Sequence, residues 1–109
     1  LSFGDGLGYA GAAGLYGLAD EFAALAAGGV TVVAAAGNRH ADRAGVAYPA
    51  ADPNVVPAGA VWAADRGSAG WAGGAADLTT GPDRLVSFSQ RDAAGATVFW
   101  LPATVGSRA

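Results

Sequence analysis

Residues 30–36 constrain the fold of this chain more than any other segment. They read Val-Thr-Val-Val-Ala-Ala-Ala, so the run is β-branched at its start and apolar almost throughout. A strand with one wet face alternates apolar and polar residues, whereas a continuous run is typical of strands covered on both faces, as in parallel sheets. The segment therefore predicts an α/β fold built on a buried parallel strand.

A helix is predicted just before this strand, over residues 15–27. Its apolar residues recur at steps of three and four, at Leu15, Leu18, Phe22, Leu25 and Ala26. Gly28 and Gly29 follow and end the helix, because glycine accepts the backbone conformation found after a helix C-terminus. Residues 1–3 read as the end of an earlier strand, so the order strand, helix, strand predicts a βαβ unit.

Further strands are predicted in the second half of the chain. Residues 55–62 form one, although Pro57 would have to lie at an edge or a bulge because proline has no N–H. Residues 85–89 and 97–101 are two more, on either side of a turn at residues 92–95. Residues 63–83 are rich in Gly, Ala and Asp and are predicted to be a surface loop or insertion.

Composition excludes several classes of function. The chain has 109 residues and a net charge of −3, and its arginines are scattered, so the concentrated positive charge of a nucleic-acid-binding surface is missing. Cysteine is absent, which excludes disulfides, thiolate metal sites and cysteine nucleophiles. No apolar run approaches the length of ~18 residues that a membrane span needs.

The ends of the sequence read as those of an internal segment. Met is absent, and the chain opens on what reads as the end of a strand, with no signal peptide before it. We therefore expect residues 1–109 to be a fragment of a longer protein.

Asn38 is the first candidate functional residue. It follows Gly37 at the carboxyl end of the predicted buried strand, and ligands of open α/β sheets bind at that edge. Its side-chain amide offers two N–H donors without a charge, which suits stabilising an oxygen that becomes negative during a reaction. A Gly-Asn pair after a strand is also a common turn, because both residues accept positive φ, and on this pattern alone that alternative stays open.

Neighbouring blocks of sequence add weight to a catalytic role. Their order is Leu1-Ser2-Phe3-Gly4, Ala34-Ala35-Ala36-Gly37-Asn38, Tyr48-Pro49-Ala50, Ala58-Gly59-Ala60-Val61 and Ser87-Phe88-Ser89-Gln90-Arg91. In this order they resemble the subtilisin-like (subtilase) serine peptidases over residues 1–103. The resemblance implies a three-layer α/β fold with a mainly parallel sheet, of which this chain would be a partial domain. It departs from the family pattern at Phe3, usually aliphatic, and at Leu101-Pro102-Ala103, where Ala-Pro-Gly is expected.

The resemblance also implies a set of site residues. Asn38 would hold the oxyanion of the tetrahedral intermediate, and the remaining positions would bind substrate around the primary specificity pocket. These are Ser2, Phe3 and Gly4 in the strand that pairs with the substrate backbone, Ala35, Ala36 and Gly37 in the facing wall, and Ala47 at the base. A small residue at the base would admit a large apolar side chain.

The catalytic triad of the family is not in this sequence. Its Asp and His motifs would precede these residues and its Ser motif would follow them. His40 is interpreted as a solvated loop residue, and Ser89 lacks the setting of a nucleophile. An intact parent would be a serine endopeptidase acting through an acyl-enzyme, whereas the 109 residues alone are expected to be inactive. The expected partners are a peptide or protein substrate and the rest of the peptidase domain, in a secreted or extracytoplasmic protein.

Other interpretations remain open. The parent could be a subtilase fold that has lost its triad and serves as a binding or structural domain. Residues 6–11 formally match the G-x-G-x-x-G pattern of dinucleotide-binding proteins, but no carboxylate ends the next strand to hold the ribose. No cofactor is expected for catalysis. A structural calcium is possible in the parent, with Asp52 as an oxygen ligand, although Asp52-Pro53 is also a common turn.

Overall fold

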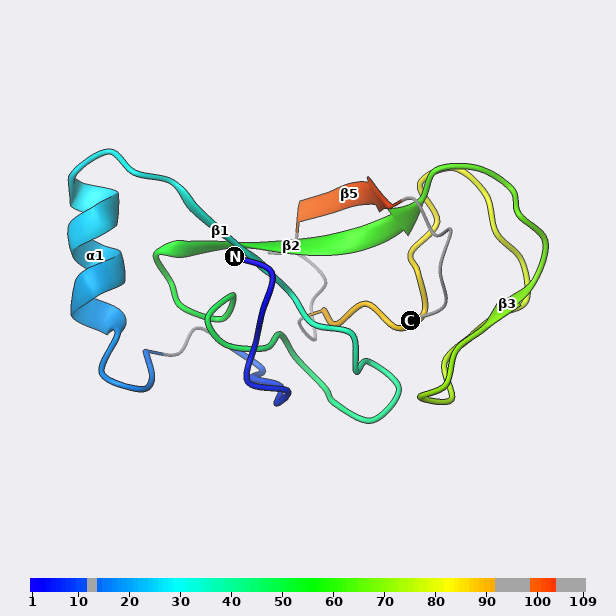
Figure 1. The fold of residues 1–109 in the computed structure, drawn as a ribbon, viewed down its shortest axis with the longest axis horizontal. Coiled ribbons are helices and arrows are strands. Elements are labelled where there is room, and N and C mark those ends of the chain that lie inside the picture. The colour runs from blue at the N-terminus through cyan, green and yellow to red at the C-terminus, as the bar shows by residue number, and fades with distance from the viewer. Residues whose placement is uncertain (12–13, 92–98, 104–109) are drawn as a thin grey trace.

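The structure, a computed structural model, describes residues 1–11, 14–91 and 99–103, the last of these as backbone only. Three parallel strands form one sheet in the order β1 (Val32–Ala35), β2 (Val55–Trp62) and β5 (Phe99–Ala103). Helix α1 (Ala19–Ala27) lies at one end of this sheet (Figure 1). At the other end is an antiparallel pair, β3 (Ala69–Gly70) and β4 (Ala76–Asp77). The predicted α/β class with a parallel sheet is confirmed at this level.

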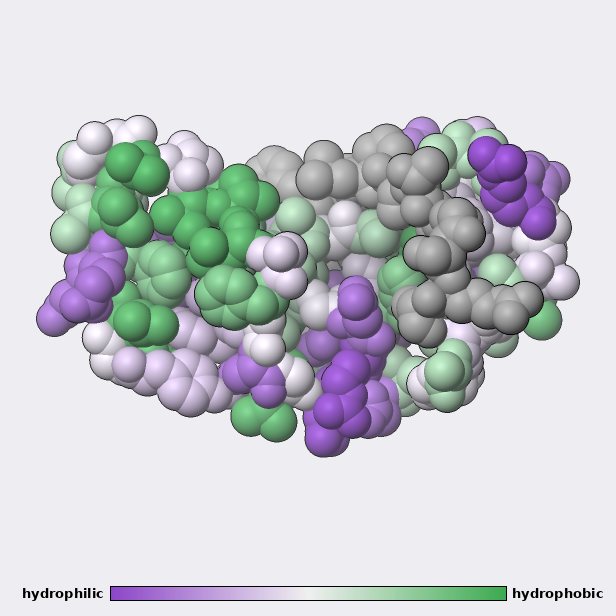
Figure 2. Space-filling view, in the orientation of Figure 1, coloured by the Kyte–Doolittle hydropathy of each residue, from purple (hydrophilic) through white to green (hydrophobic). Residues whose placement is uncertain are grey.

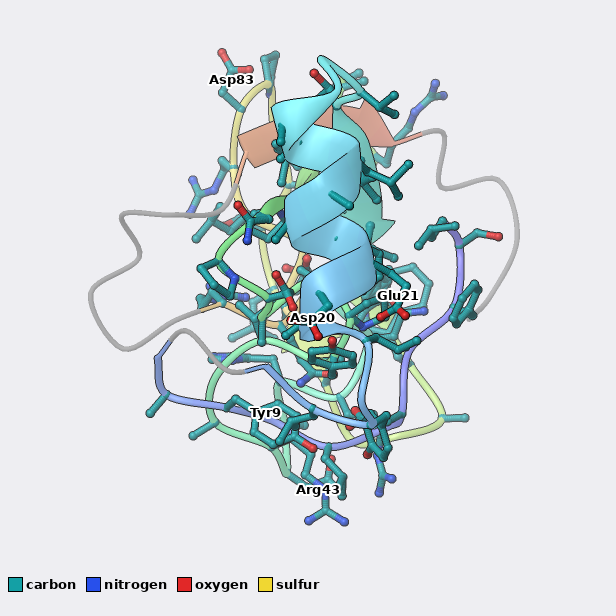
Figure 3. The ribbon with its side chains drawn as sticks, turned by 90° about the vertical axis from the view of Figure 1, so that its left-hand side faces the viewer. Tyr9, Asp20, Glu21, Arg43 and Asp83 are labelled. Carbon is teal, nitrogen blue, oxygen red and sulfur yellow. The ribbon has the colours of Figure 1, made fainter. Side chains whose placement is uncertain are left out.

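Helix α1 starts later than its apolar pattern predicts. Tyr16 has φ 58° and Gly17 has φ 68°, and this left-handed backbone cannot belong to a right-handed helix. Leu18 therefore becomes the N-cap. Asp20 and Glu21 lie in the first turn (Figure 3), where negative charge is favourable beside the helix N-terminus. Gly28 ends the helix, and its N–H donates to the carbonyl of Ala24 at 3.0 Å.

The N-terminal residue extends the sheet on the far side of β1 from β2. Its amino group donates to the carbonyl of Val33 at 2.6 Å, and the Ala35 N–H donates to the Leu1 carbonyl at 3.0 Å. Two bonds that straddle Ala34 in this way are the pattern of parallel neighbours. The arrangement agrees with the predicted βαβ unit, although residues 1–3 are too briefly paired to count as a strand.

Strand β2 is central, so the prediction that Pro57 requires an edge strand or a bulge is wrong. Pro57 pairs in register with Ala34 of β1, while pairing with β5 begins only at Ala58. The Ala36 N–H donates to the Ala58 carbonyl at 2.8 Å, so Ala58 bonds towards β1 and the preceding residue faces the other side. The missing N–H of Pro57 thus points to the β5 side, one residue before the first described β2–β5 pair, Ala58 with Phe99.

Residues 85–89 are not the strand that their pattern predicts. They form an isolated bridge, Val61 to Leu85, followed by a turn in which the Ser89 N–H donates to the Val86 carbonyl at 3.0 Å. The predicted strand at residues 97–101 is found at Phe99–Ala103, and the predicted turn at residues 92–95 lies outside the described residues.

The segment at residues 63–83 is more ordered than a plain surface loop. It contains the β3–β4 pair, and Trp71 packs against Trp62 and Phe88 with ring centroids 6.2 and 4.8 Å away. Asp77 is buried and accepts hydrogen bonds from the Trp71 ring N–H at 3.1 Å and from the Ser87 hydroxyl at 2.8 Å. This hairpin is therefore fixed to the end of β2.

One face of the sheet is packed and the other is not. The core lies between α1, β1 and the loop that follows β1, and includes Phe22, Ala34, Ala36, Val46, Tyr48, Ala50, Ala51 and Val55. Val33 points the opposite way and is 41% exposed. The prediction that β1 is covered on both faces is therefore wrong for the described residues, which supply a cover on one face only. No helix in the described ranges is long and apolar enough to cross a membrane.

Candidate functional site

Two segments run past each other at the carboxyl end of β1. The first is residues 1–4, held to β1 through Leu1, after which the Asp5 N–H donates to the Tyr48 carbonyl at 3.0 Å. The second is the end of β1 itself, where the Ala47 N–H donates to the Ala36 carbonyl at 2.9 Å. This bond holds Ala47, the predicted base of the specificity pocket, close to the end of β1. A Cβ built on Gly4 would lie 3.1 Å from the Ala47 Cβ, so a side chain at position 4 would require residues 4 and 47 to move apart by a few tenths of an ångström.

Gly37 is fixed by its backbone and by its neighbours. Its φ is 111°, a region that side chains other than glycine rarely enter. A Cβ at this position would overlap the side-chain amide of Gln90 and would lie 3.2 Å from the Ala47 Cβ. The Gln90 N–H donates to the Gly37 carbonyl at 2.8 Å, so the chain after β1 is tied to residue 90.

A cavity of about 150 Å³ lies between the two segments. Its lining includes the predicted site residues Ser2, Phe3, Gly4, Ala35, Gly37, Asn38 and Ala47, which the structure thus brings together. Ala36 is the exception: it is 1% exposed, belongs to the core and borders a neighbouring groove instead. Alternate residues of a strand point to opposite faces, which explains why Ala35 lines the cavity whereas Ala36 belongs to the core.

The neighbouring groove is larger and has a floor of small side chains. Its volume is about 610 Å³, and Ala58, Gly59 and Ala60 of β2 line it together with the end of β1. Asn38 lines both this groove and the smaller cavity. A group placed in the groove would therefore reach Asn38 from the sheet side.

Asn38 lies at a bend directly after Gly37, and its own φ is not positive. Positive φ at this turn is found at Gly37, and in the part of the chain that the structure describes the non-glycine residues with positive φ are Tyr16 and Asp83. Asn38 is exposed, and no described residue hydrogen-bonds to its side-chain amide. Its two N–H donors are thus available at the mouth of the cavity.

Gln90 is a cavity residue that the sequence patterns did not indicate. It is 1% exposed, and its amide N–H donates to the carbonyls of Leu7 at 2.9 Å and Gly45 at 3.1 Å. Its amide oxygen accepts the backbone N–H of Arg39 at 3.2 Å. These contacts join four separate segments, and sequence periodicity carries no signal for partners so far apart along the chain.

Ser89 and His40 have the structural settings expected of them. The Ser89 hydroxyl is buried and accepts the Ala60 N–H at 3.0 Å, which replaces a sheet bond beyond the end of β1. His40 is exposed in its loop. Partial burial, and secondly the positive charge of Arg91, lower the pKa of His40, so its imidazole is neutral at neutral pH.

The Asp52 carboxylate is engaged within the chain. One oxygen accepts the Tyr48 hydroxyl at 3.1 Å and the other accepts the Asn54 N–H at 2.9 Å. Asp52 is 2% exposed, and in the described ranges no group of three His, Cys, Asp or Glu side chains gathers around it or elsewhere. These contacts favour the turn interpretation of Asp52-Pro53 over a calcium ligand.

Of the glycines in residues 6–11, Gly8 allows two segments of the chain to pack closely. Tyr9 exchanges backbone hydrogen bonds with Val46 at 3.0 and 3.1 Å, and a Cβ on Gly8 would overlap the Ala44 carbonyl. Figure 3 shows Tyr9 and Arg43 at the same end of the molecule, where these two segments meet. Helix α1 begins only at Ala19, so this loop does not lead into a helix N-terminus as a dinucleotide site requires.

Asp5 lies beside the cavity without lining it. Partial burial would raise the pKa of its carboxyl group, but hydrogen bonds from Tyr9 and Tyr16, each at 2.7 Å, and from two backbone N–H groups outweigh burial and hold that pKa below its ordinary value. Asp5 is therefore an ionised anchor for the loop rather than a proton donor.

Comparison of the chain with protein families, with curated proteins and with solved structures finds no significant match.

Proposed function

We propose that this chain is part of a subtilisin-like serine endopeptidase, in which it supplies the oxyanion donor and the substrate-binding segments. The observation that carries the proposal is the position of Asn38. Its amide has no partner among the described residues and lies at the mouth of a cavity that the other predicted binding residues, except Ala36, line. Preorganised neutral donors beside a substrate pocket are the means by which acyl-transfer enzymes stabilise a developing oxyanion.

The order of events in such an enzyme follows from general chemistry. A serine hydroxyl, deprotonated by a histidine, attacks the scissile carbonyl, and the C–O bond that forms gives a tetrahedral intermediate with a negative oxygen. The Asn38 N–H would donate to that oxygen. The intermediate then expels the amine, which takes the proton from histidine, and water later hydrolyses the acyl-enzyme by the reverse sequence.

The groove beside Asn38 supports a nucleophile supplied from outside these residues. Its floor of Ala58, Gly59 and Ala60 allows a backbone to approach closely, and a segment seated there would reach the Asn38 side of the cavity. In this proposal the Asp, His and Ser of the triad come from the rest of a three-layer peptidase domain.

Exposed apolar surface supports the view that more of a domain packs on this chain. Figure 2 shows hydrophobic residues gathered over α1 and the adjoining part of the sheet. Leu1 is 53% exposed, Val30 50% and Val33 41%, and these residues flank the uncovered face of β1. Contiguous apolar surface of this kind marks a place where another element packs.

The test is peptide hydrolysis by the full-length protein and its Asn38→Ala variant. We expect kcat to fall by about 10²–10³ with little change in KM, because the donor acts on the transition state and not on the bound substrate. That magnitude is the one known for the oxyanion asparagine of subtilisin itself. Asn38→Asp is the matched control for shape: it places an acceptor and a negative charge where a donor is needed, and should be at least as slow.

Two results would overturn the proposal. An unchanged kcat in Asn38→Ala removes Asn38 from the oxyanion role. A full-length protein that binds peptides in the cavity and hydrolyses none would instead be a peptide-binding domain on the same fold.

A further inference from the structure

The cavity next to Asn38 carries one formal charge among its described lining residues, and it is positive. Arg39 supplies that charge, and the remaining lining side chains are neutral. A carboxylate inside the cavity would therefore meet a cation and no lining anion. This charge departs from the sequence-based expectation of a pocket for a large apolar side chain.

The backbone and head group of Arg39 are held at the cavity rim. Its backbone N–H donates to the Gln90 amide oxygen at 3.2 Å, which fixes where the side chain starts. Its Nη1 lies 3.5 Å from the Gly6 carbonyl oxygen, so the guanidinium extends from the β1 side of the cavity to the segment that follows Gly4. At that length the contact with Gly6 is weak and can yield to a better acceptor.

The guanidinium keeps binding capacity for a ligand. It has five N–H donors, and its contacts within the described residues are the one with Gly6 and one with Asp42, where Nη2 and Oδ2 are 2.7 Å apart. The planar fork of arginine matches a carboxylate, which can take two parallel hydrogen bonds.

Asp42 weakens this site without cancelling it. The side chains of Arg39 and Asp42 are 49% and 51% exposed, and exposed ion pairs of this kind are worth little because water competes for both charges. The Asp5 carboxylate does not line the cavity, and its Oδ2 accepts both the Tyr9 and the Tyr16 hydroxyls.

The size of the cavity fits a side chain of moderate length. Its volume is about 150 Å³, and its lining residues include the small Gly4, Gly37 and Ala47. A glutamate side chain in this space would carry its carboxylate at the end of a short apolar stem. Ala47 at the base leaves room for that stem.

We propose that Arg39 makes this pocket selective for an acidic side chain, with glutamate preferred over the isosteric glutamine. The proposal rests on the proposed function, since it places the side chain on the acyl side of the scissile bond in the pocket. Arg39 is then a specificity-determining residue, and Asp42 limits its strength.

The test compares two peptides that differ only in Glu or Gln at that position. Both kcat/KM and, independently of turnover, the dissociation constant by calorimetry are measured on the full-length protein. We expect the Glu peptide to be favoured roughly two- to fivefold, the range of a half-exposed charge pair. The preference should disappear in Arg39→Gln, persist in the matched control Arg66→Gln, and increase in Asp42→Asn, which frees the guanidinium.

The outcomes separate this inference from the proposed function. Hydrolysis with equal values for the two peptides, or a preference that survives Arg39→Gln, overturns the role of Arg39 and leaves the peptidase intact. Tighter binding of the Glu peptide, lost in Arg39→Gln, without any hydrolysis sustains the pocket inference and overturns the peptidase. An arginine that served only the fold would change both peptides equally in Arg39→Gln, and the ratio would not respond to Asp42→Asn. Absence of both binding and hydrolysis overturns the two together.

Discussion

Gly37→Ala should destabilise the protein far more than an ordinary glycine substitution. The first contribution is backbone strain, because φ is 111° at this position and a left-handed conformation costs a non-glycine residue roughly 1–2 kcal/mol. The second is the overlap of the new Cβ with the buried Gln90 amide. If that amide moves, its partners at Leu7 and Gly45 lose a donor, and an unsatisfied buried group costs about 1–3 kcal/mol.

Together these contributions amount to roughly 2–5 kcal/mol, a large share of the usual 5–15 kcal/mol of folding stability. Gly29→Ala is the matched control, since Gly29 has φ 82° and its added Cβ would have nothing within 4 Å. Gly29→Ala should therefore show only the backbone contribution, roughly 1–2 kcal/mol.

The assay is equilibrium unfolding in urea, with the free energy of unfolding compared among Gly37→Ala, Gly29→Ala, Gln90→Ala and the double variant Gly37→Ala/Gln90→Ala. Removing the Gln90 side chain relieves the overlap, so the double variant should lose less than the sum of its single changes. Equal losses for Gly37→Ala and Gly29→Ala, or strict additivity in the double variant, would refute the reasoning.

Two further predictions concern buried polar groups. Ser89→Ala should lower the free energy of unfolding by about 1–3 kcal/mol, because the Ala60 N–H loses its acceptor. The same variant should still form the covalent acyl-enzyme and hydrolyse peptides. Loss of the acyl-enzyme in Ser89→Ala would instead identify Ser89 as the nucleophile. Burial would raise the pKa of Asp77, but hydrogen bonds from Trp71 and Ser87 outweigh it and lower that pKa below 3.8. Since the pKa of Asp77 is lower in the folded protein, the stability that its carboxylate contributes is complete above pH 3.8 and is lost as the pH falls towards the folded pKa. When the free energy of unfolding is measured against pH in acid, this loss should be absent in Asp77→Asn. The same pH dependence in the variant and the unmodified protein would contradict the prediction.

The sequence predicted the elements that depend on local pattern. Helix α1 and strands β1 and β2 follow from apolar periodicity and β-branched runs, and the central residues of each element lie within the predicted range. The helix start was missed because the left-handed backbone of Tyr16 leaves no trace in an apolar pattern. Residues 85–89 alternate like a strand, yet Ser87 bonds to Asp77 and Ser89 to Ala60, and neither partner can be read from the segment itself.

The site was predictable to the extent that the family resemblance reached it. The resemblance indicated Asn38 and most of the cavity lining, and the structure gathers those residues around one cavity. Arg39 and Gln90 were missed as lining residues for different reasons. The partners of Gln90 are distant in the sequence and come close only in the folded chain. Arg39 adjoins Asn38, but its position in the sequence does not show that its side chain extends towards the cavity.

The contacts of Gln90 also set the order in which the cavity can assemble. Its amide reaches back to Leu7, a sequence separation of 83 residues, and closing so long a loop is entropically slow compared with forming α1 or pairing nearby residues. The helix and the β1–β2 pair can therefore form while the cavity is still open. A chain that ends before residue 90, whether truncated by design or still emerging during synthesis, would have α1 and the β1–β2 pair but not its pocket.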